Sequence, residues 1–503
     1  MKAKALLSLL FAMGISTAQA DPLSAVDWLS EILETPQEAV PETPSNGTSI
    51  ETIETTKLSD VQKDTVGILP SQVSGIPPNF WGGSSVDRLA AFIRNAPTGQ
   101  LPEITDLWRR IMFAELDPPV GMTEENTLLL ARLDALLTAG DLDPTEALLK
   151  AADPNNPQLF RRWFDVSILT QRASEACSRM VSTPRFAPTL QARVFCLARS
   201  GDWNAAAITL NTAKVLGEIS KDEATLLEMF LDPELYDGEH DPPIPAILTP
   251  LNFLMREALA LPRPAQSLPL AFLHMDLQNK AGWKLRITSA ERLARENAIP
   301  SVALLDLYLE GTPSASGGVW ERVKAVQELV AALNSNDDAT LPEALINAHN
   351  ALAPLDLQAA LSEWFAPALE GRMLTPQAKS IGFELAVLNT NAYDLVFELA
   401  STSQIEQFVL SILSDRFNAP PHGNLQQAIY NALAGYSPKT VLHQTVDNGR
   451  SGEAVLSALT LLHDGPQSDV GDIEVALSVL SYAGFRSEAK RIATQLLLLK
   501  GNS

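Results

Sequence analysis

The chain has few of the residues that most enzymes use for chemistry: its 503 residues include two cysteines and six histidines. No C-x-x-C motif is present, which disfavours a redox-active cysteine pair. The histidines never stand four residues apart, and there is no H-E-x-x-H motif to hold zinc. We therefore predict that the histidines lie on helix or loop surfaces and that the protein has no metal site.

Other catalytic motifs are missing as well. There is no G-x-S-x-G turn to expose a serine nucleophile, and the glycine-rich segment 311–318 lacks the G-x-x-x-x-G-K pattern of a phosphate-binding loop. Ser487 and Lys490 formally make an S-x-x-K pair, but the accompanying K-T-G motif is absent. Carboxylates are so numerous that their positions do not indicate a glycosidase pair. We predict no catalytic residue, no cofactor and no enzyme activity.

Long apolar runs are confined to the first 20 residues. Lys2 and Lys4 precede an apolar stretch, and Ala18-Gln-Ala20 has the small-x-small pattern of a cleavage site. We predict a signal peptide over residues 1–20, cleavage after Ala20 and export to the periplasm. No cysteine follows the site, which disfavours a lipid anchor. No later run approaches the roughly 20 apolar residues of a membrane span, so a membrane-spanning protein is not expected.

Positively charged residues are also scarce: the chain has 37 Lys and Arg but 60 Asp and Glu, and its net charge is −23. Such acidity repels nucleic acid and anionic lipid surfaces, and we exclude nucleic acid as a partner. It favours a basic patch on a protein partner. A second interpretation, in which the charge simply keeps an exported protein in solution, stays open.

The clearest positive signal is a helical hairpin within residues 195–213. Gly201 supplies the positive φ that ends one helix, and Asp202 can cap the next. Small and apolar residues at the crossing allow two antiparallel helices to approach closely. On the second helix they share one face: Ala206, Leu210 and Ala213.

The same pattern returns near the end of the chain. Gly484 is followed at the same offsets by Ala489, Ala493 and Leu496. With Trp203 after the first turn glycine, the pattern resembles the tetratricopeptide repeat family, although its period of about 34 residues and its terminal proline are absent. The resemblance implies an all-α fold, a superhelical array of antiparallel helix hairpins. A hairpin within an ordinary helical bundle is the alternative.

The two cysteines, Cys177 and Cys196, flank a break at Thr183–Pro188 between two helical runs. In antiparallel neighbours they would lie at comparable heights. An oxidising compartment favours their pairing, which would stabilise the fold by about 3 kcal/mol. We predict a disulfide, with two buried free thiols as the alternative.

Residues 21–34 form a candidate amphipathic helix, followed by a Thr-, Pro- and Glu-rich segment that we expect to be disordered. Such a helix on a tether is typical of a linear docking motif. It could dock onto its own chain or capture another protein. The candidate contact residues are Leu23, Val26, Trp28, Leu29, Ile32 and Leu33.

We expect a linker and an irregular strap over 35–83, a helical-repeat module over 84–338 and a second helical module over 339–503. A capping box at Ser220–Glu223 opens one of the helices. Further helices are predicted over 158–181, with a possible break, and over 265–280.

From shape and compartment, the sequence predicts a non-catalytic scaffold or adaptor that binds protein partners of the cell envelope. Periplasmic helical-repeat proteins of this kind include accessories of flagellar motors, which the resemblance allows as one assignment. The alternative is a peptidoglycan-active enzyme or subunit, because lytic transglycosylases carry similar superhelices. Nothing in the sequence indicates the oligomeric state.

Overall fold

The computed structural model describes Val26, Trp28, Leu29 and residues 63–499, with gaps at 96–100, 122–125, 237–239, 279, 314 and 336–337. Within these residues the protein is all-helical, which confirms the predicted class; no strand is formed, and one isolated bridge joins Leu69 to Ala114. The predicted signal peptide and most of the predicted linker lie outside the described residues.

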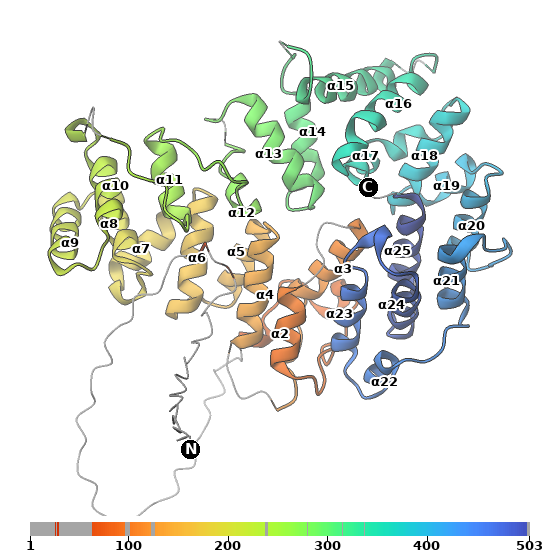
Figure 1. The fold of residues 1–503 in the computed structure, drawn as a ribbon, viewed down its shortest axis with the longest axis horizontal. Coiled ribbons are helices and arrows are strands. Elements are labelled where there is room, and N and C mark those ends of the chain that lie inside the picture. Colours follow the sequence, from red (N-terminus) through yellow and green to blue (C-terminus); the bar gives the residue numbers. More distant parts are fainter. Residues whose placement is uncertain are drawn as a thin grey trace, which may run out of the picture.

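The chain follows a closed path (Figure 1). It starts at the lower centre, runs out to α9 and returns along the upper edge. The outgoing elements are η1 (Lys63–Thr65), α1 (Ser71–Ser74), α2 (Val86–Arg94), α3 (Pro102–Phe113), α4 (Thr127–Thr138), α5 (Leu142–Ala151), α6 (Pro157–Leu169), α7 (Ser174–Ser182), η2 (Pro184–Phe186), α8 (Leu190–Arg199) and α9 (Trp203–Leu216). The returning elements are α10 (Lys221–Leu231), η3 (Pro233–Tyr236), α11 (Pro250–Ala258), α12 (Leu270–Leu273), α13 (Trp283–Arg295) and α14 (Ser301–Leu309).

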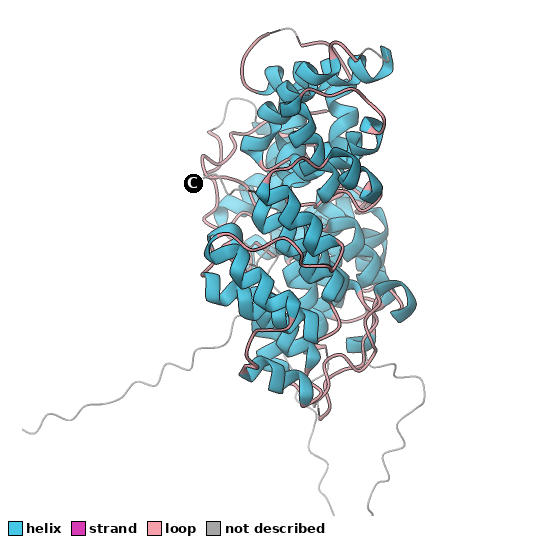
Figure 2. Cartoon of the chain, turned by 90° about the vertical axis from the view of Figure 1, so that its right-hand side faces the viewer, coloured by secondary structure: helices cyan, strands magenta, loops and turns pink. Residues whose placement is uncertain are grey.

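The second half of the chain makes the opposite arm and comes back to the start. The arm contains α15 (Val319–Ser335), α16 (Leu341–Leu352), η4 (Ala353–Leu355), α17 (Gln358–Phe365), η5 (Ala366–Leu369), α18 (Pro376–Leu388), α19 (Tyr393–Leu399), α20 (Gln404–Leu413) and α21 (Gly423–Ala434). The closing elements are α22 (Val441–Asp447), α23 (Ser451–Leu461), η6 (Gly465–Gln467), α24 (Val470–Tyr482) and α25 (Arg486–Leu498). Seen from the side, the helices stack into a narrow slab (Figure 2).

The hairpin expected around Gly201 is present. Gly201 has φ 85°, and the Asp202 carboxylate accepts a hydrogen bond from the N–H of Ala205 at 3.0 Å. Three of the expected packing residues are buried against the preceding helix: Ala206, Leu210 and Ala213. Trp203 is 57% exposed, so its ring does not fill the hairpin interface.

The second hairpin joins α24 to α25 through Gly484, whose φ is 97°. Its expected packing residues are all buried: Ala489, Ala493 and Leu496. The predicted capping box is also formed, because the Ser220 hydroxyl accepts from the N–H of Glu223 and the Glu223 carboxylate accepts from the N–H of Ser220. The predicted disulfide is confirmed: Cys177 on α7 is bonded to Cys196 on α8.

The buried apolar side chains form two clusters. The main cluster draws on helices up to α12 and again on α20 to α25, whereas the middle cluster runs from Leu273 to Val409. We call the helices around these clusters the main unit and the middle unit. Helix α12 belongs to both, because Phe272 lies in the main cluster and Leu273 in the middle one. The predicted division into two modules at residue 338 stays a prediction, and that position falls inside the middle unit.

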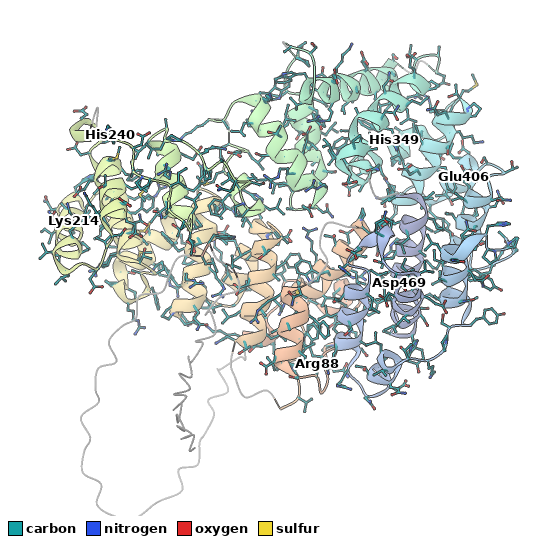
Figure 3. All side chains as sticks on the ribbon, in the orientation of Figure 1. Arg88, Lys214, His240, His349, Glu406 and Asp469 are labelled. Carbon is teal, nitrogen blue, oxygen red and sulfur yellow. A yellow bond between two sulfur atoms is a disulfide. The ribbon has the colours of Figure 1, made fainter. Side chains whose placement is uncertain are left out.

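The two ends of the described chain are bonded to each other. The Nε and Nη2 atoms of Arg491 on α25 each donate to one carboxylate oxygen of Glu103 on α3, both at 2.7 Å. Arg88, which Figure 3 labels on α2, forms an ion pair with Glu453 on α23 at 3.0 Å. Further along, the N–H of Gly452 donates to the carbonyl of Phe80 at 2.8 Å. The main unit is therefore built from both ends of the sequence, with the middle unit between them.

Candidate functional site

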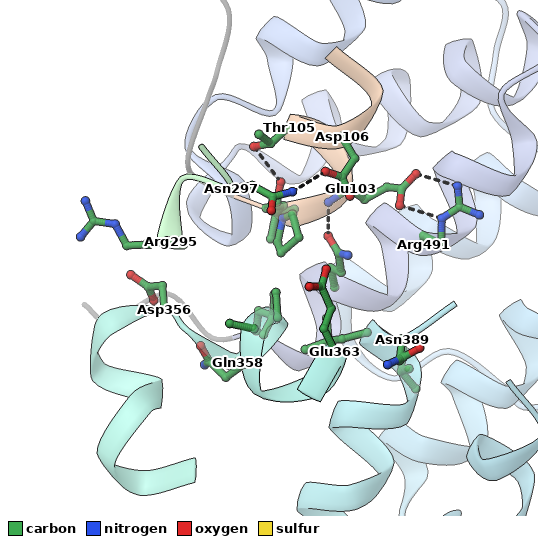
Figure 4. A pocket seen from close by; sticks show the side chains of 18 of the residues that line it. Glu103, Thr105, Asp106, Arg295, Asn297, Asp356, Gln358, Glu363, Asn389 and Arg491 are labelled. Atoms are coloured by element: carbon green, nitrogen blue, oxygen red, sulfur yellow. Dashed lines mark hydrogen bonds and ion pairs between the residues drawn. The ribbon is translucent and has the colours of Figure 1, made fainter. Parts of the chain in front are cut away.

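A cavity of about 610 Å³ lies where the main unit meets the middle unit. Its walls come from the start of α3, the α13–α14 turn, α17, the end of α18, η6 and α25. Segments from the beginning, middle and end of the sequence therefore share one site (Figure 4). Five carboxylates line it: Glu103, Asp106, Asp356, Glu363 and Asp464.

The start of α3 is fixed by α25. Pro102 is pre-organised for the first helical position, and no side chain of α3 itself caps its N-terminus. Instead, the amide oxygen of Gln495 accepts the N–H of Glu103 at 3.0 Å. Burial raises the pKa of Glu103, and the bonds and charge of Arg491 oppose that rise. Because Arg491 holds both carboxylate oxygens, Glu103 is a positioning residue that joins the helices.

Asp106 lies one turn further along α3 and faces the cavity. Its carboxylate accepts from the side-chain amide of Asn297, at the α13–α14 turn, at 2.7 Å. The side chain reaches water, yet the protein that surrounds it removes solvation and raises its pKa. Arg109 and Asn297 lower this pKa, and the negative charge of Glu363 raises it again.

Glu363, on α17, points toward Asp106 from the opposite wall (Figure 4). Its carboxylate accepts a hydrogen bond from the Ser301 hydroxyl at 2.5 Å. Among the residues that the structure describes, neither Asp106 nor Glu363 takes part in an ion pair within 4.0 Å. The two carboxylates therefore face each other across the cavity, where both side chains are exposed to solvent.

Amide side chains complete the polar lining. Asn389 is buried, donates to the carbonyl of Ser362 at 2.9 Å and accepts from the N–H of Asn391 at 2.8 Å, which fixes the end of α18 against α17. Gln358, Asn391 and Gln467 add further donors and acceptors to the wall. Such a lining suits a polar ligand with a positive charge, because carboxylates accept ammonium or guanidinium protons and amides bond a peptide backbone.

The structure places the predicted contact residues elsewhere. Val26, Trp28 and Leu29 are buried within the main cluster, whereas Leu23, Ile32 and Leu33 lie outside the described residues. The disulfide and the Gly201 hairpin belong to the arm that ends at α9 and line no part of the cavity.

The residues of the candidate catalytic motifs make structural contacts. Lys490 of the S-x-x-K pattern donates to the carbonyl of Leu413 and to Asp415. His240 and His349 lie on opposite arms (Figure 3). The surface prediction is wrong for His443, which is 3% exposed because its ring closes a cap with Thr440 and contacts Ser478. In the part of the chain that the structure describes, no three His, Cys, Asp or Glu side chains are grouped to hold a metal ion.

The residues of the cavity carry no recognisable sequence signal. Asp106 and Glu363 are far apart in the chain and belong to no motif. The one indirect signal was Pro102 at a helix start, which places Glu103 and Asp106 in the first two turns of α3 but does not show what those turns face.

No helix in the described ranges has the length and hydropathy that crossing a bilayer requires. Comparison of the chain with protein-family models, curated proteins and solved structures yields no match.

Proposed function

We propose that this chain is a non-catalytic adaptor of the bacterial cell envelope, and that its central cavity takes a basic segment of a protein partner. The observation that carries the proposal is the pair Asp106 and Glu363, two carboxylates that face each other without an ion pair to a described residue. Each negative charge disfavours the ionised form of the other, and a cation placed between them would favour both ionised forms. A lysine or arginine side chain placed between them would supply that cation.

The whole molecule supports the same proposal. The net charge of −23 attracts basic surfaces at long range and speeds their association. The amide side chains next to the carboxylates can form hydrogen bonds with the backbone of an inserted segment. The export signal and the tetratricopeptide-like hairpins, which are expectations from the sequence, agree with an adaptor that works in the periplasm through stacked helices.

Site-specific crosslinking in living cells tests the proposal. A photo-crosslinking amino acid at Asn391, on the cavity wall, should yield an adduct whose partner peptide is rich in Lys or Arg. The same amino acid at the exposed Thr212 on α9 is the positional control. The Asn391 adduct should disappear when Asp106→Asn and Glu363→Gln are combined.

A second variant is the control for the change in net charge. It combines Glu218→Gln with Glu343→Gln, which replace two exposed acids outside the cavity. This variant has the same net charge as the cavity variant and should keep the adduct. An Asn391 adduct that survives in the cavity variant, or that is lost equally in both variants, would contradict the proposal.

One observation favours the peptidoglycan-active alternative. The raised pKa of Asp106, next to a second carboxylate in a polar cavity, is an arrangement that general acid–base chemistry uses. Purified protein incubated with sacculi would then release soluble muropeptides, and Asp106→Asn would abolish the release. We favour the adaptor because amides and carboxylates line the cavity from six elements, as suits a bound segment.

A further inference from the structure

The N-terminal segment is seated on its own chain. Val26, Trp28 and Leu29, which we call the anchor segment, are each at most 9% exposed. The N–H of Leu29 donates to the carbonyl of Val26 at 3.2 Å, so the segment makes a tight turn. The Trp28 ring meets the ring of Phe272 edge-on at 5.4 Å. The anchor segment is thus buried against its own chain and is not free to capture a partner.

The surface on which the anchor segment lies is connected to the middle unit by a series of side-chain contacts. Phe272 on α12 meets Phe253 on α11 at 5.3 Å, and the Arg263 guanidinium lies over the Phe253 ring at 5.5 Å. Arg263 also donates to the buried Asp276 at 2.7 Å. Asp276 in turn accepts from the hydroxyl of Ser289, on α13, at 2.7 Å.

This series of contacts crosses the junction between the two units. Helix α12 spans four residues, and its neighbouring side chains Phe272 and Leu273 enter different clusters. Helix α13 is the next helix after α12, and its far end, with Ala294 and Arg295, lines the cavity. The anchor segment therefore contacts the main unit at the place where the middle unit is attached.

We propose that the surface formed by Phe253 and Phe272 is a docking site for the chain's own anchor segment, and that Trp28 braces the α12 junction between the two units that enclose the cavity. Without the indole, one side of Phe272 loses its packing partner, and the contacts between α11, Arg263 and α13 loosen. This inference concerns the rigidity of the junction and does not depend on what the cavity binds.

The occupant is this segment in cis and not a segment of a second copy, for two reasons. The structure of the single chain already seats it. In addition, covalent attachment gives it a high effective concentration at the site, which a free competitor would have to exceed.

Hydrogen exchange of the backbone amides tests the proposal on the chain from Asp21 onward. In Trp28→Ala, the amides of α12 and of the first turns of α13 should exchange at least tenfold faster than in the unchanged protein. Trp203→Ala is the matched control, because it removes the same side chain from an exposed position on α9. Equal exchange in Trp28→Ala and Trp203→Ala would overturn the proposal.

A second measurement covers the case in which Trp28→Ala perturbs the fold more widely. A variant without residues 21–34 is mixed with a synthetic peptide of that sequence, and the peptide should restore slow exchange in α12, whereas the same peptide with Trp28→Ala should not. Failure of the unchanged peptide to restore protection at saturating concentration would contradict docking at this site. Light scattering that shows a dimer dependent on Trp28 would overturn the assignment in cis.

Discussion

At the scale of single residues, His274 links the stability of the α12 junction to pH. Its Nε2 donates to the carbonyl of Gly140, the turn glycine between α4 and α5, at 2.7 Å. Burial lowers the pKa of His274 below its ordinary value of 6.5. A group that binds its proton less tightly in the folded state than in the unfolded state loses stability on acidification.

We therefore expect the free energy of unfolding to fall as the pH drops below 6.5 toward the folded-state pKa. His274→Gln keeps a side-chain donor for Gly140 but cannot titrate, so its loss of stability between pH 7.5 and pH 5 should be smaller. Urea denaturation at the two pH values measures this difference. His463→Gln, at an exposed ring, should behave as the unchanged protein, and equal pH dependence in all three proteins would contradict the prediction.

Residue-scale predictions from the sequence succeeded where the signal was local. Gly201, Asp202 and the Ser220 cap act on neighbours within five residues, so spacing alone determines their roles. The Cys177–Cys196 disulfide could also be predicted, because both cysteines lie beside one turn. Asp106 and Glu363 were not predictable, since their proximity depends on how distant helices meet.

At the scale of elements, proline explains the largest error in the predicted helices. The helix expected over 265–280 is reduced to α12, four residues that begin after Pro269. Proline favours a helix start but restricts the preceding residue to extended conformations, and the chain turns again after His274. The possible break in 158–181 is real, because α6 ends at Leu169 and α7 begins at Ser174.

The contact between the entry strap and α23 yields an element-scale prediction. A Cβ at Gly452 would lie 2.4 Å from the Trp81 ring, and Trp81 is fully buried. Because neither ring nor helix can move without disturbing the core, Gly452→Ala should lower the free energy of unfolding by about 2 kcal/mol. Chemical denaturation measures it. Gly83→Ala, whose Cβ meets nothing within 4 Å, is the control, and equal stabilities of the two variants would show that α23 does not pack as described.

The salt bridge that joins α3 to α25 gives a second prediction at the scale of elements. Glu103 is 9% and Arg491 32% exposed in their side chains, and they are bonded through both carboxylate oxygens. A double-mutant cycle with Glu103→Gln and Arg491→Gln should give a coupling free energy of about 2 kcal/mol. The exposed pair Lys324–Glu328 should give less than about 0.5 kcal/mol. A coupling at Glu103–Arg491 no larger than this reference would mean that the pair does not help to join the ends of the chain.

At the scale of the whole molecule, the fold depends on contacts between the first and the last helices. Helix α2 packs against α23 and helix α3 against α25, so the main unit needs both ends of the chain and the middle unit is held between them (Figure 1). Local patterns predict hairpins and an array, but not the contact between its first and last helices, because that contact depends on the summed rotations of all the pairs between them. The cavity is a product of this closure, and no single stretch of sequence contains it.

Isothermal titration calorimetry tests the central claim most directly. A short peptide with alternating Lys and Ala is titrated into three proteins: the unchanged chain, the cavity variant (Asp106→Asn with Glu363→Gln) and the surface variant (Glu218→Gln with Glu343→Gln). Binding at one site should be at least tenfold weaker in the cavity variant, and it should be unchanged in the surface variant at 0.15 M salt, where the Debye length of about 8 Å screens distant charges. Equal affinity in the cavity and surface variants, or no binding to the unchanged chain, would contradict the claim that the cavity receives a basic segment.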